Sequence, residues 1–167
     1  SVHGLVMPSV VNTEDNMSDA EWVAQELGIT YDVVEIQPIA EAFFDAFPEA
    51  AEDRTAAGNV YVRTRAVMAY FVANHEGKVV LGTGNRSEAL TGYFTKYGDG
   101  AVDCHPIGNL YKQQVRQLAA SLGVPEELVA KTPSAEMWSG QTDEAEMGLD
   151  YDTLDAILAL HVDGPLS

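Results

Sequence analysis

Residues 78–88 read KVVLGTGNRSE, and this stretch decides the fold class. Residues 78–81, in which three apolar residues follow a lysine, are typical of a buried strand, and they lead directly into a glycine-rich turn at 82–84. A helix is expected to begin after the turn, and the free N–H groups at its start can bind an anion. In parallel sheets, ligands collect beyond the carboxyl ends of the strands, so this turn is a candidate ligand site.

The same alternation of strands and helices is predicted before this stretch. Strands are expected over 2–7 and 31–36, with a helix between them that begins at a Ser18–Glu21 capping box and ends at Gly28. Strands that alternate with helices favour a doubly wound parallel sheet with right-handed crossovers. The sequence therefore predicts an α/β fold.

Further helices are predicted from apolar spacing and from proline and glycine positions. Pro38 suits the first turn of one helix, and a second helix is expected over 59–74. The residues expected to face the core are Ile39, Phe43 and Phe47 in the first helix and Val67, Tyr70 and Phe71 in the second. Later helices are expected over 110–122 (closed by Gly123), after Pro125 and over 151–160, with loops over 49–58 and 132–148.

The chain is strongly acidic, with 9 Lys and Arg against 26 Asp and Glu and a formal net charge of −17. Such a surface repels nucleic acids and anionic membranes, so neither is expected as a partner. The acidic runs 143–146 and 150–155 are expected to form a solvated face. Because screening acts over about 3 Å at molar ionic strength, this composition favours a protein adapted to high salt.

The cysteine content and the lengths of the apolar runs exclude several classes of protein. The single cysteine, Cys104, excludes an intrachain disulfide framework and a multi-cysteine zinc site, and it is expected to be buried. The longest apolar run, 66–73, is much shorter than the roughly 20 residues that a membrane span needs. No signal-peptide pattern opens the sequence. A cytoplasmic protein of one domain is therefore expected.

A second candidate ligand-binding segment, residues 91–103, reads TGYFTKYGDGAVD. One interpretation is a solvated turn with stacked aromatic rings, and the other is a polar pocket in which Lys96 and Asp103 contact a ligand. Five basic residues also lie between positions 63 and 112 and could contact the same ligand: Arg63, Arg65, Arg86, Lys96 and Lys112. In so acidic a chain, this concentration favours a small polyanionic ligand such as a nucleotide.

Several strings occur together in a fixed order. They are LGTGNRSE at 81–88, GYFTKYGDGAVD at 92–103, PIGNLYK at 106–112, LGVPEEL at 122–128 and PSAEMWSGQTDE at 133–144, with GLVMPS near the start and NVYVRTR at 59–65. Taken together, they resemble the ammonia-dependent NAD⁺ synthetases over essentially the whole chain. The resemblance implies the adenine nucleotide α-hydrolase fold, a relative of the Rossmann-like doubly wound sheets, and a single synthetase domain over 1–167.

The resemblance also implies a ligase that forms a C–N bond in the last step of NAD biosynthesis. ATP adenylates deamido-NAD⁺ with release of pyrophosphate, and ammonia then displaces AMP to give NAD⁺. The implied cofactors are ATP and Mg²⁺, and the implied assembly is a homodimer. The implied site residues are Thr83, Lys112 and Ser134 for ATP, with Lys112 catalytic at the phosphates, Glu88 for Mg²⁺, and Arg63, Lys96 and Asp103 for deamido-NAD⁺.

Two motifs of that family do not occur in these 167 residues: the SGGxDS pyrophosphate-binding loop and the C-terminal His-Lys pair. We therefore expect a chain truncated at both ends and inactive on its own. A glutaminase domain is also absent, which favours free ammonia as nitrogen donor unless a segment outside this sequence carries one. Two alternatives stay open: another ATP pyrophosphatase such as a GMP synthetase, and a non-catalytic nucleotide-binding fragment.

Overall fold

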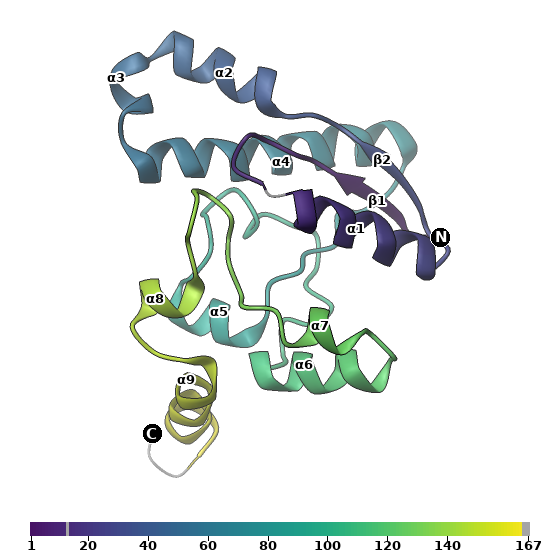
Figure 1. Ribbon diagram of the computed structural model, residues 1–167, viewed down its shortest axis with the longest axis vertical. Coiled ribbons are helices and arrows are strands. Elements are labelled where there is room, and N and C mark those ends of the chain that lie inside the picture. Colours follow the sequence, from purple (N-terminus) through teal and green to yellow (C-terminus); the bar gives the residue numbers. More distant parts are fainter. Residues whose placement is uncertain (13, 165–167) are drawn as a thin grey trace. The chain divides into compact units, whose positions relative to one another are not determined.

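The computed structural model describes residues 1–12 and 14–164 (Figure 1). The chain forms two compact units. The first, here called the N-unit, comprises residues 1–79 together with 136–140. The second, the C-unit, comprises residues 80–135 and the described residues from 141 onward. Because the chain enters the N-unit a second time at 136–140, the units are not simple halves of the sequence.

A parallel β–α–β element opens the N-unit. Strand β1 (His3–Val6) pairs with β2 (Thr30–Val33), and helix α1 (Glu14–Glu26) connects them. Figure 1 shows both strands beside α1. Gly28 has a φ of +62°, and the Ile29 N–H donates to Ala24 O at 3.0 Å, so the predicted glycine stop is confirmed.

The predicted start of α1 is wrong. The helix begins at Glu14, and Ser18 lies inside it as an exposed residue rather than at its N-cap. Ser18 is the fifth residue of this helix, so the N–H groups that a Ser18–Glu21 capping box would satisfy lie beyond its unpaired first turn.

Three helices complete the N-unit: α2 (Gln37–Ala46), α3 (Pro48–Ala51) and α4 (Arg54–Glu76). Pro38 lies in the first turn of α2, as predicted. The predicted loop over 49–58 is wrong because α3 forms there and Asp53 caps α4, accepting the N–H groups of Thr55 and Ala56 at 2.8 and 2.9 Å.

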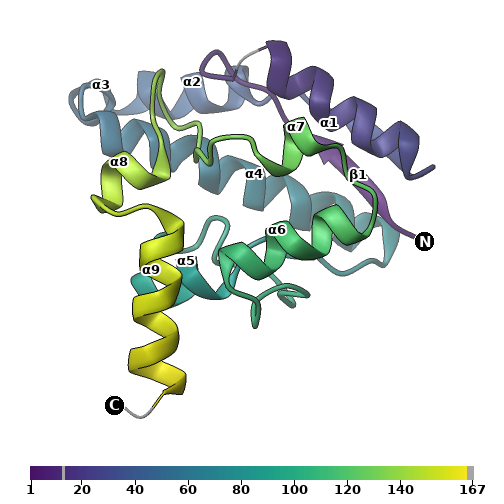
Figure 2. The same cartoon turned by 60° about the horizontal axis from the view of Figure 1, so that its bottom comes forward.

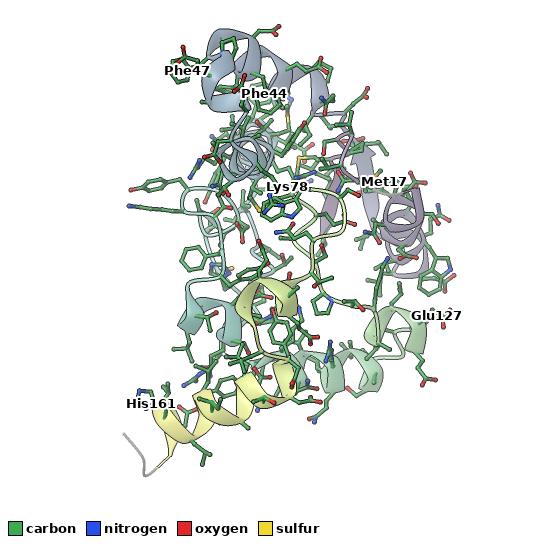
Figure 3. All side chains as sticks on the ribbon, turned by 60° about the vertical axis from the view of Figure 1, so that its left-hand side comes forward. Met17, Phe44, Phe47, Lys78, Glu127 and His161 are labelled. Atoms are coloured by element: carbon green, nitrogen blue, oxygen red, sulfur yellow. The ribbon has the colours of Figure 1, made fainter. Side chains whose placement is uncertain are left out.

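The N-unit core lies between α2 and α4, around the buried residues Ile36, Ala40 and Tyr61. The rings of Phe44 and Tyr61 meet edge to face, with centroids 5.6 Å apart. Figure 3 shows Phe44 directed toward α4, whereas Phe47 points away from it.

The faces of α2 and α4 that were predicted to be buried are largely exposed. Val67 and Phe71 are each 70% exposed, and Phe43 and Phe47 also lie on the surface. Helix α4 buries instead a face that contains Gly58, Tyr61 and Thr64. Apolar spacing identifies residues that share a face, but it does not say which of several apolar faces the core covers.

The C-unit is helical. Its elements are α5 (Arg86–Thr91), α6 (Lys112–Ser121), α7 (Glu126–Val129), α8 (Asp143–Met147) and α9 (Tyr151–Leu158), which continues as the π-helical turn η1 (Ala159–Asp163). Figure 2 shows α9 next to α5 and α6. The predicted helices over 110–122, after Pro125 and over 151–160 are confirmed, and Gly123 has a φ of +83°. The predicted loop over 132–148 is wrong in part, since it contains α8.

The predicted buried strand over 78–81 does not form. Only an isolated parallel bridge between Leu81 and Cys104 occurs there, with the Gly82 N–H donating to Cys104 O at 2.8 Å. The Asp103 N–H also donates to Val80 O at 3.0 Å, but these contacts do not extend into a strand, and the side chains of Val79 and Leu81 are exposed. Among the described residues, none of the helices combines the length and the hydropathy that a membrane span requires.

Candidate functional site

A capping box at the start of α5 holds the carboxylate of Glu88. The Asn85 side chain accepts the Glu88 N–H at 3.0 Å, and Glu88 Oε2 accepts the Asn85 N–H at 2.9 Å. Asn85 Nδ2 also donates to Glu88 Oε1 at 2.6 Å. Glu88 is thus an acidic residue in the first turn of α5, and its carboxylate has a fixed orientation.

Lys112 is the first residue of α6, and its side chain meets Glu88. The Lys112 Nζ lies 3.4 Å from Glu88 Oε1 and 5.0 Å from the centroid of the Tyr151 ring. Both members of the ion pair are mostly buried, with side chains 21% and 19% exposed. The structure thus brings together the predicted catalytic lysine and the predicted magnesium ligand, but it pairs them with each other.

A buried network below this pair fixes the helices that carry it. The Ser87 hydroxyl donates to Asp155 Oδ1 at 2.5 Å and accepts the Lys112 N–H at 2.9 Å. Asp155 Oδ2 accepts the Gln113 N–H at 2.9 Å. Because Ser87 belongs to α5, Lys112 to α6 and Asp155 to α9, these bonds join three helices at one point.

Sequence reasoning missed Asp155, although a signal was present. Tyr151, Leu154 and Asp155 follow the i, i+3, i+4 spacing of one helix face, and all three are buried. A carboxylate inside an apolar stripe indicates a buried partner, which here is Ser87. The predicted solvated face over 150–155 is therefore wrong at Asp155.

A second pair of buried groups lies behind Lys112. The Tyr151 hydroxyl donates to Asp143 Oδ2 at 3.0 Å, and the Asp143 side chain is in the interior, so the predicted solvated face over 143–146 is wrong at this residue. Nearby, the Tyr93 hydroxyl donates to Glu146 Oε2 at 2.6 Å. Burial, and then the neighbouring carboxylates, raise the pKa values of Tyr93 and Tyr151 well above their ordinary value. Both hydroxyls therefore remain hydrogen-bond donors at neutral pH.

The glycines of the turn at 82–84 make room for a histidine. A Cβ at Gly82 would lie 2.6 Å from Nδ1 of His105, and one at Gly84 would lie 3.3 Å from the same atom. The side of the turn that lacks side chains therefore faces His105. Sequence reasoning attributed these glycines to a close ligand, and it did not identify this packing. Thr83, between them, is exposed.

The other predicted site residues lie on the surface. In the C-unit, the Lys96 Nζ lies 4.9 Å from the centroid of the Tyr97 ring, and Asp103 Oδ2 accepts the Val80 N–H at 2.7 Å. Ser134 is exposed in the same unit, and Arg63 is exposed on α4 in the N-unit. The roles of these residues remain predictions.

Among the described residues, Glu88 is not part of a cluster of metal-ligating side chains. In the part of the chain that the structure describes, no three or more His, Cys, Asp or Glu side chains gather where they could hold a metal ion. Cys104 is exposed, so its predicted burial is wrong.

Comparison with known proteins gives the family. The sequence model of the NAD synthase family matches residues 1–165. The chain belongs to this family. It is 66% identical over 166 residues to the NH(3)-dependent NAD(+) synthetase of Halobacterium salinarum, a match that covers 99% of this chain and 62% of that relative. A relative of the same name from Pyrococcus horikoshii is 51% identical over 97% of this chain. The chain thus spans about 62% of the length of these two relatives.

Solved structures agree with the family match. An NMN synthetase from Francisella tularensis has a TM-score of 0.90 and 38% identity, and the match covers 99% of this chain and 68% of that one. An NH3-dependent NAD synthetase from Campylobacter jejuni has a TM-score of 0.73 and 31% identity, covering 98% and 68%. The predicted fold class, α/β of the adenine nucleotide α-hydrolase kind, is confirmed.

Proposed function

We propose that this chain carries part of the active site of an ammonia-dependent NAD⁺ synthetase, a cytoplasmic ligase that makes the last C–N bond in NAD biosynthesis. The observation that carries the proposal is the Glu88–Lys112 pair, held by two helix N-termini, in a chain 66% identical to a relative of that name. The substrates would be ATP, deamido-NAD⁺ and ammonia.

The proposed reaction has two steps. A carboxylate oxygen of deamido-NAD⁺ attacks the α-phosphorus of ATP, and pyrophosphate leaves. The nitrogen of ammonia then attacks the activated carbonyl carbon, and AMP leaves with the former carboxylate oxygen. Neither step needs a nucleophilic side chain. The Lys112 ammonium would stabilise the negative charge that develops on the phosphate, which requires it to turn from Glu88 toward the nucleotide.

Glu88 fits the role of a single carboxylate ligand for Mg²⁺. Each of its oxygens accepts bonds from Asn85 and still has room for another partner, particularly Oε1 once Lys112 turns away. Mg²⁺ commonly takes one or two carboxylates and completes its shell with water and phosphate oxygens. When bound, the ion would neutralise phosphate charge.

The remaining residues would surround the substrates. Thr83 and Ser134 would contact ATP, while Arg63, Lys96 and Asp103 would contact deamido-NAD⁺. Support comes from their exposure and from their places in strings that resemble the family. The two units would then belong to one synthetase domain over 1–167, in line with a family match to residues 1–165.

The exposed face of α4 supports a homodimer. Arg63, Val67 and Phe71 repeat at every fourth position and are all exposed. Large apolar side chains on one open helix face are typical of an interface, and they would place Arg63 beside a ligand shared by two subunits. The net charge of −17 supports adaptation to high salt.

A second candidate function concerns the substrate. The higher TM-score of 0.90 to a protein named NMN synthetase favours nicotinate mononucleotide as an alternative carboxylate, with the same adenylation and amidation. A GMP synthetase is disfavoured, because the NAD synthase match extends over 165 residues. A non-catalytic nucleotide-binding fragment would bind ATP without forming AMP.

Product analysis tests these proposals. The complete protein that carries this sequence is incubated with ATP, Mg²⁺ and ammonium at low and molar KCl, with deamido-NAD⁺ in one arm and nicotinate mononucleotide in the other. We expect NAD⁺ and AMP in equal amounts in the first arm and little product in the second. A faster reaction in the second arm would favour NMN synthesis, and binding without AMP in both arms would contradict a synthetase.

A further inference from the structure

We propose that Tyr151 and Asp143 form a positioning pair that sets the orientation of the Lys112 ammonium, with Asp143 held in turn by its backbone bond to Pro133. The inference rests on the proposed role of Lys112 at the phosphates. It adds two residues that touch no substrate but act through the lysine.

The first step is the contact between Lys112 and Tyr151. At 3.4 Å, the Lys112–Glu88 contact is longer than the roughly 2.7–2.9 Å of a strong charged hydrogen bond. Glu88 alone therefore orients the ammonium weakly. The Tyr151 ring, 5.0 Å from Nζ, supplies a second attraction, because a partly desolvated ammonium is attracted to an aromatic face. The position of the Tyr151 ring therefore influences the position of the Lys112 ammonium.

The second step is the bond that fixes the ring. Tyr151 is fully buried, and its hydroxyl donates to Asp143 Oδ2 at 3.0 Å. The Asp143 side chain is itself only 5% exposed, so no water replaces either partner readily. Loss of this bond would leave a buried hydroxyl or carboxylate unsatisfied, and the ring would have to move to regain a partner.

The third step links Asp143 to the neighbouring segment. Its backbone N–H donates to Pro133 O at 3.0 Å and so joins the two ends of the stretch between residues 133 and 143. Among the described residues, the other carboxylate oxygen, Oδ1, is buried and has no hydrogen-bond partner. Tyr93 is a near neighbour, but its single hydroxyl proton goes to Glu146.

Nuclear magnetic resonance of the lysine ε-methylene groups tests the positioning directly. These 167 residues contain only four lysines, and a Lys112→Arg variant assigns the signal of interest. We expect the Lys112 ε-protons to be shifted upfield by the Tyr151 ring. Tyr151→Leu should abolish that shift, and Tyr151→Phe and Asp143→Asn should change it although the ring remains.

A matched pair in the same unit provides the control. Lys96 lies over Tyr97 at 4.9 Å, but Tyr97 is 71% exposed, so no buried hydrogen bond holds its ring. Tyr97→Phe should leave the Lys96 signal unchanged. If Tyr151→Phe leaves the Lys112 signal equally unchanged, the positioning proposal is wrong, and Tyr151 only fills space.

Steady-state kinetics on the complete protein gives the second readout. Tyr151→Phe should lower kcat by about 10-fold, because small misplacements of a catalytic group commonly cost up to about 10²-fold, with little change in the KM for ATP. A changed Lys112 signal with normal kcat would keep the positioning but contradict the role of Lys112 in catalysis. An unchanged signal would overturn the positioning whatever the activity, even if Asp143→Asn fails to fold.

Discussion

Replacing Ser87 by alanine should destabilise the C-unit far more than the loss of one oxygen atom suggests. The fully buried Ser87 hydroxyl donates to Asp155 and accepts the Lys112 N–H, so Ser87→Ala leaves two groups without that partner. Among the described residues, Asp155 keeps its bond from the Gln113 N–H. An unsatisfied buried group costs about 1–3 kcal/mol, so we expect a loss of roughly 2–4 kcal/mol in the free energy of unfolding.

Urea unfolding followed by far-ultraviolet circular dichroism measures this loss. Hydrogen exchange at the Lys112 amide gives a local readout, since that N–H loses its acceptor in Ser87→Ala. Ser121→Ala is the matched control in the same unit, because the exposed Ser121 hydroxyl only donates to Leu118 O at the end of α6. The control should lose about 0.5 kcal/mol or less.

The reasoning would be refuted by equal stabilities of the two variants with a Lys112 amide that stays protected in both. In that case water would replace the Ser87 hydroxyl, and the junction of α5, α6 and α9 would not depend on this bond.

Three further predictions concern the site and the charge. In the complete protein, Lys112→Ala should lower kcat by about 10²-fold or more because it removes charge stabilisation at the phosphate; a higher KM at unchanged kcat would instead indicate a binding role. Glu88→Gln keeps a side chain that can form the capping box, yet it should require much more Mg²⁺ in a magnesium titration; full activity at ordinary Mg²⁺ would exclude the metal role. The free energy of unfolding should rise from low to molar KCl, because salt screens repulsion within a chain of charge −17; a fall would argue against adaptation to salt.

Local patterns in the sequence predicted most element types. The parallel β–α–β start, Pro38 in the first turn of α2 and the stop at Gly123 all follow from the residues themselves. These features depend on backbone propensity and on neighbours a few positions away, and both are visible in the sequence.

Features that depend on a distant partner were not predictable. The strand expected at 78–81 needs backbone to pair with, and only the bridge at Cys104 is present within residues 1–12 and 14–164. The inward face of α4 depends on α2, and both helices carry more than one apolar face. The sequence pattern alone therefore determined neither whether residues 78–81 form a strand nor which face of α4 is buried.

The candidate site was predictable in part. The Glu88–Lys112 contact joins residues 24 positions apart, and it was not predicted: the family resemblance singled out both residues, but for separate roles. Asp143 and Asp155 lie in acidic runs that are typical of solvated surface, yet each is buried against a hydroxyl group. A run of acidic residues does not show which of its members is buried, because neighbouring side chains of a helix face different directions.

The fate of the carboxylate oxygen tests the central claim most directly. Deamido-NAD⁺ labelled with heavy oxygen in its nicotinate carboxylate is incubated with the complete protein, ATP, Mg²⁺ and ammonia, and the AMP is analysed by mass spectrometry. If the carboxylate attacks the α-phosphorus, AMP carries one labelled oxygen and NAD⁺ keeps the other. Unlabelled AMP, or a label that appears in inorganic phosphate with ADP as the second product, would contradict the proposed adenylation.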